Sequence, residues 1–402
     1  MNVINKKNNY SEKALVALCV VLWFLGSLVR PFWILCNRFL HIPYGLSLSF
    51  IMPVIIICLI IASMPLIIKR VNSSQLFLYG LFSIIFIISI IQYPDNPALK
   101  ELGIGYFFLY LPYIFLGSCF DIKRLYKIFY VASLLVLVKE TFYLFVFRAA
   151  SDMLEDGGEY ISAAYNLLPS ILFLIWHSFN RPKYYNILLS IFGVFILSGY
   201  GNRGSLVCVF IFVFVLIALR LFDKQKPWKI IGLVAVFGFV YIFLDEILIN
   251  VELLLNNLGF SNRVFYLTTE YGLGEDSSTQ GRLYYYSQAL SALDSGLWGF
   301  GMAGDRIPLQ GGYSHNIIVE CIVSYGYFGG SLFLLSLFLL LIKAIRKVKI
   351  YEEQVFLFLL ICIGFIQAFI SGSYVNNIWF YFLLGYCTKI ISKTNKYSVS
   401  YV

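Results

Sequence analysis

Charged residues are scarce in this sequence. Only 13% of its 402 residues are charged, whereas 60% are hydrophobic and 18% are aromatic. Soluble globular domains are about 25% charged, so this composition excludes a water-soluble protein. It predicts an all-α, polytopic membrane protein, because a helix pairs its own backbone groups inside lipid.

The groupings that bind metals or cofactors are also missing. The sequence has three histidines and eight cysteines, and they form no cluster with metal-binding or redox spacing. It contains no Asp-x-Asp pair and no glycine-rich loop that would cradle a phosphate. We therefore expect neither a metal nor another cofactor.

Long apolar runs are what the sequence has in abundance. A membrane helix needs about 20 mostly apolar residues, and the runs predict about twelve spans within one integral membrane domain, residues 1–402. No small-residue cleavage site follows the first run, so we expect an uncleaved span there. The predicted spans are 14–35, 45–68, 75–92, 102–119, 126–147, 160–179, 185–200, 204–222, 229–246, 315–342, 354–372 and 374–392.

Lysine and arginine are distributed unevenly between the predicted loops. With a cytoplasmic N-terminus, most basic residues fall on the cytoplasmic side, as the positive-inside rule requires. Both termini are then cytoplasmic, and the polar segment 247–314 is a large, partly helical extracytoplasmic loop. This topology accounts for the net charge of +9, so we expect no nucleic-acid partner. The cytoplasmic clusters lie at 6–13, 69–70, 123–127, 181–183, 220–229, 343–349 and 389–396.

The remaining basic residues are mostly arginines. The planar guanidinium group can grip phosphate or carboxylate with two hydrogen bonds, so we expect an outer face that binds an anion. The alternative is that these arginines only pair with nearby acidic residues. The set comprises Arg30, Arg38, Arg148, Arg203, Arg263, Arg282 and Arg306, with Lys100 and Lys139.

Two of these arginines are predicted at the N-terminal ends of helices on the outer face. Arg203 lies in a Gly-Asn-Arg-Gly-Ser turn, and Arg282 follows Gly281 ahead of a helical pattern of apolar residues. Free backbone N–H groups at such helix ends favour anions. We predict that both arginines bind a multiply charged anion; a structural turn or a carboxylate pair is the alternative.

His315 is predicted at the start of another outer helix end. It follows Ser314, Asn316 adds a second polar group, and Glu320 lies further along the same helix. A neutral imidazole accepts a proton near neutral pH. His315 is therefore a candidate general base, unless it is only a helix-start residue at the membrane surface.

Two adjacent pairs of charged residues complete the candidates. Lys139 and Glu140 fall inside a predicted span, where charges are costly and usually functional. They either line a water-filled cavity or form an ion pair. Asp305 and Arg306 are candidates in the loop region.

These motifs together resemble a known family. The Gly-Asn-Arg-Gly-Ser-Leu turn at residue 201 is followed by Gly281-Arg282, by Gly-Phe-Gly at 299–301 and by Ser-His-Asn at 314–316, with Glu320 and glycines at 326, 329 and 330. This order resembles the O-antigen polymerase (Wzy) and O-antigen ligase superfamily of bacterial membrane glycosyltransferases. The resemblance covers 185–345; the first half of the chain is similar in hydropathy only.

The resemblance implies a GT-C-like, metal-independent glycosyltransferase at the outer face of the bacterial plasma (inner) membrane. Its donor would be an oligosaccharide linked to undecaprenyl diphosphate, with Arg203 and Arg282 holding the leaving diphosphate. His315 would be the general base or would orient the acceptor; because no second histidine follows it, Glu320 or Glu140 are alternative bases. A single displacement would invert the anomeric centre. Further substrate-binding candidates are Asn316, Glu140 and Arg306.

Within this family we predict a repeat-unit polymerase for O-antigen, capsule or exopolysaccharide. It would transfer the growing glycan to the next lipid-linked unit, alongside a flippase and a chain-length regulator. One alternative is the ligase, which uses the lipid A core as acceptor; nothing in the sequence separates the two. The other is a lipid-linked oligosaccharide flippase or transporter, which predicts internal repeats and ionisable residues near the bilayer midplane.

Overall fold

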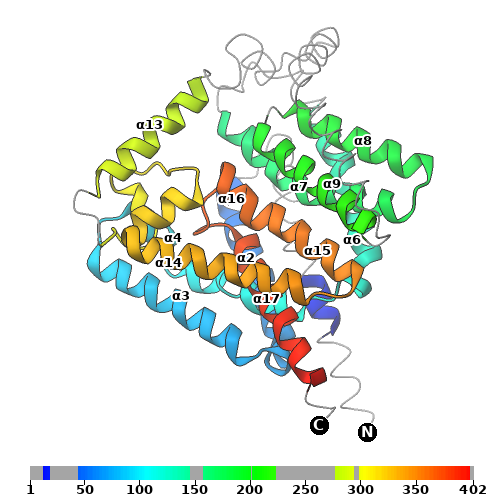
Figure 1. The fold of residues 1–402 in the computed structure, drawn as a ribbon, viewed down its shortest axis with the longest axis horizontal. Coiled ribbons are helices and arrows are strands. Elements are labelled where there is room, and N and C mark those ends of the chain that lie inside the picture. Colours follow the sequence, from blue (N-terminus) through cyan, green and yellow to red (C-terminus); the bar gives the residue numbers. More distant parts are fainter. Residues whose placement is uncertain are drawn as a thin grey trace. The chain divides into compact units, whose positions relative to one another are not determined.

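The computed structural model describes residues 12–18, 44–144, 157–200, 202–222, 277–293 and 298–398 (Figure 1). Within these ranges the chain is helical and contains no strand. Contacts divide it into two units, Met1–Arg70 with Cys119–Lys224, and Val71–Ser118 with Gln225–Val402. We call them unit 1 and unit 2. The predicted all-α class is confirmed.

Unit 1 is built around one central helix. Helix α7 contacts α6, α8 and α9, and its side chains at Leu168, Ile171, Leu172 and Trp176 are fully or almost fully buried. A helix that is apolar on all sides takes the centre of a bundle. The main helices of unit 1 within the described residues are α2 Tyr44–Arg70, α6 Ile122–Phe142, α7 Gly157–Asn180, α8 Tyr184–Gly199 and α9 Arg203–Phe222.

Unit 2 is organised around its last helix. Helix α17 packs against α14, α15, the π-helical turn η4 and α3, and its Phe380 and Tyr381 meet Phe82 of α3 edge to face. The main helices are α3 Ser73–Gln92, α14 Ile317–Lys347, α15 Tyr351–Leu360, η4 Ile361–Ile366, α16 Gln367–Ile370 and α17 Ile378–Ser398 (Figure 1).

The two ends of unit 2 differ in chemistry. At one end, where α14 finishes and α3 begins, Lys393 pairs with Glu353 at 2.9 Å and Asn72 donates to Ser392 at 2.9 Å. The sequence predicts this end to be cytoplasmic. At the other end α14 begins and α16 finishes, and that end carries the candidate residues 282–320.

The predicted span 102–119 is wrong as a single helix. It is divided into η1 Tyr106–Tyr110 and α5 Tyr113–Cys119, after the short helix α4 Pro97–Leu102. Gly103 adopts a φ of 44°, which ends α4, and Pro112 lacks the N–H that a continuous helix would need. Gly103 and Pro112 therefore interrupt the helix that the apolar run predicted.

Three helices of the described residues are long and apolar enough to cross a membrane, judged by length and composition. They are Ser73–Gln92, Ile317–Lys347 and Tyr351–Ile370. Shorter apolar helices include α8, whose 16 residues extend about 24 Å at about 1.5 Å per residue, less than a bilayer core of about 30 Å. The predicted span 229–246 lies outside the described residues, and most of 14–35 does too. The number of twelve spans and the GT-C-like class stay predictions.

Helix α14 is interrupted at Gly326, and the loop that contains Gly299 and Phe300 packs on the interruption. Gly326 has a φ of 74° and a ψ of 172°, a region that only glycine enters readily. Around this break, the carbonyl of Val323 accepts the N–H of Phe300 at 3.0 Å. A Cβ on Gly299 would collide with the backbone of Ser324 and Gly326. These two glycines therefore let the loop lie directly on α14.

Substitution of Gly326 by alanine tests this role. Alanine at that φ costs about 1–3 kcal/mol, so we expect Gly326→Ala to lower the thermal unfolding midpoint of the purified protein in detergent. Gly80→Ala in α3 is the matched control, because a Cβ there meets nothing within 4 Å. Equal midpoints for the two variants would contradict the role given to Gly326.

Candidate functional site

Arg282 is presented by a helix that packs on α14. In α13 Ser277–Ser291, Ala289 lies in a buried apolar cluster with Leu293, Val319 and Val323. Full burial of one leucine side chain contributes about 1.5–3 kcal/mol, so this cluster fixes the helix. The predicted helix is confirmed, but it begins at Ser277. The prediction that Arg282 lies at the N-terminal end of this helix is therefore wrong: Arg282 lies in the second turn, beyond the four N–H groups that a helix start leaves free.

The guanidinium group of Arg282 has one protein partner among the described residues. Its Nη1 donates to the carbonyl oxygen of Ile370, the last residue of α16, at 3.0 Å. A guanidinium has five N–H donors, and no carboxylate of the described residues pairs with this one. Among these residues, therefore, the charge of Arg282 is not balanced by a carboxylate.

His315 contacts the next residue of the same peptide segment. Its Nδ1 is 3.3 Å from the carbonyl oxygen of Ser371, and its ring packs on Tyr313 with 3.9 Å between ring centroids. A carbonyl oxygen only accepts, so Nδ1 carries the proton. In the neutral ring Nε2 is then the proton acceptor.

Burial favours the neutral form of this imidazole. Desolvation lowers the pKa of His315 below its ordinary value of 6.5, and the positive charges of Arg282 and Arg306 lower it too. The hydrogen bond to Ser371 and the charge of Asp305 act in the opposite direction but are outweighed. At pH 7 His315 is therefore able to accept a proton.

Asn316 begins helix α14. Its side-chain oxygen accepts the N–H groups of Ile318 and Val319 at 2.8 and 3.4 Å, and Ile317 is the first helical residue. The residue before this cap, His315, has a φ of 55°. This φ lies in the left-handed region, which residues other than glycine adopt uncommonly.

Arg306 is enclosed by two carboxylates. Its Nη1 donates to Asp305 and to Glu320, both at 2.5 Å, and its Nη2 donates to the hydroxyl of Ser373 at 2.6 Å. The side chains of Arg306, Asp305 and Glu320 are 6%, 0% and 1% exposed. Burial opposes the charge of Arg306, but Glu320 and Asp305 outweigh it and raise the pKa of Arg306 further.

Glu320 is fully committed within this cluster. One of its oxygens accepts from Arg306 and from Ser373, both at 2.5 Å, and the other accepts the N–H of Tyr374 at 3.1 Å. The structure thus places Glu320 and Arg306 together and close to the end of α14 that carries His315.

Arg203 and Glu140 belong to unit 1. Asn202 caps α9 through the N–H of Ser205 at 3.3 Å, so Arg203 is the first residue of a helix, as predicted; its side chain lies outside the described residues. Glu140 is buried, pairs with Lys139, and accepts the hydroxyl of Tyr200. It therefore fastens the turn that leads to Arg203. The convergence of Arg203 with Arg282 and His315 stays a prediction.

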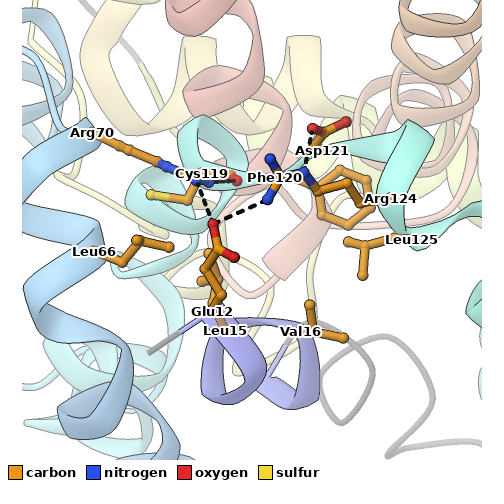
Figure 2. Close-up of a pocket in the computed structure, with 10 residues that line it drawn as sticks. All are labelled: Glu12, Leu15, Val16, Leu66, Arg70, Cys119, Phe120, Asp121, Arg124 and Leu125. Atoms are coloured by element: carbon orange, nitrogen blue, oxygen red, sulfur yellow. Dashed lines mark hydrogen bonds and ion pairs between the residues drawn. The ribbon is translucent and has the colours of Figure 1, made fainter. Parts of the chain in front are cut away.

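A separate pocket in unit 1 involves other arginines. Figure 2 shows the carboxylate of Glu12 between Arg70, 3.6 Å away, and Arg124, 3.0 Å away. These residues come from three segments that the predicted topology places on one side of the membrane. Exposed ion pairs of this kind contribute about 0–1 kcal/mol. Both arginines are paired with Glu12. The contacts around this pocket therefore attach residues 12–18 to the rest of unit 1.

The segment between α16 and α17 was missed by sequence reasoning. The prediction placed Ser371 at the end of the span 354–372 and Ser373 between that span and the next, and it gave neither residue a role. The backbone of Ser371 contacts His315, and the hydroxyl of Ser373 contacts Arg306. The signal was the polar run Ser-Gly-Ser-Tyr-Val-Asn-Asn at 371–377, which interrupts two apolar runs. Among the described residues, no three metal-ligating side chains come together.

The apolar helices and the polar end of unit 2 define an integral membrane protein of helical-bundle type. Residues 187–334 match the family model Wzy_C, described as O-Antigen ligase. This confirms the resemblance to the O-antigen polymerase and ligase superfamily over that part of the chain, which includes Arg203, Arg282 and His315. The family carries out glycosyl transfer in polysaccharide biosynthesis with lipid-linked oligosaccharides. Comparisons with curated proteins and with solved structures give no match.

The protonation of His315 is directly measurable, because the chain has three histidines. We expect nuclear magnetic resonance of the protein with isotope-labelled histidine to give His315 a titration midpoint below 6.5, the ordinary value. The reason is that burial penalises the charged ring. The His315 signal is assigned by its loss in His315→Gln. A midpoint above the ordinary value would contradict the neutral form at pH 7.

Proposed function

We propose that this protein is a polysaccharide repeat-unit polymerase. It transfers a growing glycan from undecaprenyl diphosphate to the next lipid-linked repeat unit on the outer face of the bacterial plasma membrane. The observation that carries the proposal is that Arg282 and His315 bond to the carbonyls of consecutive residues, Ile370 and Ser371. A cation that can bind the leaving group and a base that can take the proton of the acceptor therefore lie close together.

The reaction needs these two kinds of group. The acceptor hydroxyl attacks the anomeric carbon of the donor glycan, the bond from that carbon to the diphosphate oxygen breaks, and the lipid diphosphate leaves with the electron pair. Nε2 of His315 takes the hydroxyl proton. The donors of Arg282, joined by Arg203, stabilise the negative charge that grows on the diphosphate. One displacement inverts the anomeric centre, and no metal is required.

The available donors of Arg282 support the phosphate role. Arg306 has its charge balanced by two buried carboxylates, whereas Arg282 is bound only to a backbone carbonyl among the described residues. Of these two arginines, Arg282 is therefore the one to which a diphosphate would bind. The carbonyl oxygen of Ile370 orients the guanidinium without neutralising it.

The second candidate function is O-antigen ligase, which the description of the matching family model favours. Ligase and polymerase share the donor and the charge at the leaving group. They differ in the acceptor, which is the lipid A core for the ligase. The test must therefore read the product rather than the site.

Deletion of the gene, followed by gel analysis of surface polysaccharide, separates these functions. We expect the deletion strain to carry one repeat unit per lipid, because chain extension is lost. Unattached long chains would indicate the ligase instead. The strain is then complemented with Arg203→Ala or Arg282→Ala, and we expect no chain extension although the variants reach the membrane at the normal level.

The matched control for the arginine variants is Lys100→Ala. Lys100 is an exposed cation that pairs with Asp95 at 3.1 Å, and its loss should leave chain length unchanged. Normal long chains in both arginine variants would count against the diphosphate role.

Substitution of His315 by alanine tests the base. Loss of general base catalysis costs about 10²–10⁴-fold, so we expect the turnover rate to fall by that factor while binding of undecaprenyl diphosphate persists. Arg282→Ala should instead weaken the binding of undecaprenyl diphosphate. Turnover at the wild-type level would exclude His315 as the base.

A further inference from the structure

We propose that the buried cluster Asp305–Arg306–Glu320 is a positioning device that holds His315 against the carbonyl of Ser371. The proposal rests on the proposed function, since His315 is the group that acts on the acceptor there. It gives Arg306 and Glu320 a different task from the substrate binding and catalysis that the sequence indicated. The cluster holds the backbone or side chains of Ser314, Ser373 and Tyr374.

Asp305 fixes the backbone on one side of the imidazole. One carboxylate oxygen accepts from Arg306 at 2.5 Å, and the other accepts the N–H of Ser314 at 2.8 Å. Ser314 is the residue before His315, and Asn316, the residue after it, caps α14. The left-handed backbone of His315 is thus held from both sides. Such a conformation persists only where its surroundings determine it.

Glu320 and Arg306 fix the partner segment on the other side. Ser373 donates to Glu320 at 2.5 Å and accepts from Arg306 at 2.6 Å, and the N–H of Tyr374 donates to Glu320 at 3.1 Å. Ser373 also accepts the N–H of Val375 at 3.3 Å. The turn that presents the carbonyl of Ser371 is therefore anchored to the same guanidinium as Ser314.

A third connection runs through an aromatic ring. The guanidinium carbon of Arg306 lies 5.4 Å from the ring centre of Tyr313, and Tyr313 packs on the imidazole of His315. The hydroxyl of Tyr313 is 3.5 Å from the carbonyl oxygen of Ser371. One cation therefore reaches the His315–Ser371 contact by way of Asp305, Ser373 and Tyr313.

The geometry requires arginine in particular. Two different nitrogens of its planar group bind in fixed directions, Nη1 to the carboxylates and Nη2 to Ser373. A lysine ammonium is a single point charge on a flexible stem. The cluster has one positive and two negative side chains. The N–H groups of Ser314 and Tyr374 satisfy the remaining carboxylate oxygens.

The test uses the full-length protein in detergent and the histidine titration described above. Asp305→Asn keeps an acceptor for the N–H of Ser314 but removes the negative charge, and Arg306→Gln removes the positive charge. Asp305 raises and Arg306 lowers the pKa of His315. We therefore expect the midpoint of His315 to fall in Asp305→Asn and to rise in Arg306→Gln. The matched controls Asp95→Asn and Lys100→Gln alter an exposed pair and should leave it unchanged.

A neutral variant covers the case in which the charge variants do not fold. Ser373→Ala removes the hydroxyl between Arg306 and Glu320 and leaves all charges in place. Misplacement of a catalytic group by about 1 Å costs on the order of 100-fold, so we expect turnover to fall between about 10- and 100-fold. Binding of undecaprenyl diphosphate should stay within about 2-fold of the wild type, which is small beside that misplacement cost. Ser287→Ala, at an exposed serine of α13, is its control.

The outcomes separate this proposal from the proposed function. Midpoints that do not move, or that move in the same direction in both charge variants, overturn the positioning device. Turnover of Ser373→Ala equal to that of Ser287→Ala overturns it as well, and so does loss of undecaprenyl diphosphate binding in Ser373→Ala. Opposite shifts of the midpoint support the device even if the wild-type protein extends no glycan, a result that would overturn the proposed function alone.

Discussion

The buried ion cluster around Arg306 is the interaction on which the polar end of unit 2 depends. Moving an unpaired charge out of water costs several kcal/mol, and Arg306 is almost completely buried. Asp305 and Glu320 offset that cost in the observed arrangement, in which Nη1 of Arg306 donates to both carboxylates and Nη2 donates to Ser373. Because Asp305 comes from the loop, Glu320 from α14 and Ser373 from the segment before α17, the cluster fixes these three parts of the chain together.

The contrast between Arg306 and Arg282 shows how environment divides the work between identical side chains. Both lie near His315 in the same unit. Arg306 is paired with two carboxylates and is almost closed to solvent. Arg282 is only partly buried, and within the described part of the chain it donates to one carbonyl oxygen. Because its charge is already balanced, Arg306 serves to hold parts of the protein together. A charge that is oriented but not balanced is suited to a ligand that arrives with its own negative charge.

Sequence reasoning located the helices better than the contacts between them. Apolar runs placed α3, α14 and α17 close to their observed limits, and the polar residues near 200 correctly separated α8 from α9. The motif around His315 correctly marked the start of α14. These features are local, because hydropathy, capping and glycine act over a few residues.

The missed features depend on distant partners. The spacing of Asp305, Arg306 and Glu320 along the chain carried no sign that Ser373 completes their cluster. Gly103 and Pro112 were present in the predicted span 102–119, but the apolar run was weighted above them. The pairing of Glu140 with Tyr200 likewise joins two helices that hydropathy treats separately.

The π-helical turn η4 Ile361–Ile366 has a consequence for how this protein tolerates change in length. A π-turn holds one residue more than an α-helical turn of the same rise, and here it comes directly before α16. Removal of one residue from η4 would close this wider turn to a regular α-helical one, so α15 and α16 would keep their angular relation. Removal of one residue from the regular helix α15 would instead rotate all that follows by about 100°. The carbonyl of Ile370 would then point away from Arg282. A change in length is therefore tolerated at η4 and not in the regular helix before it.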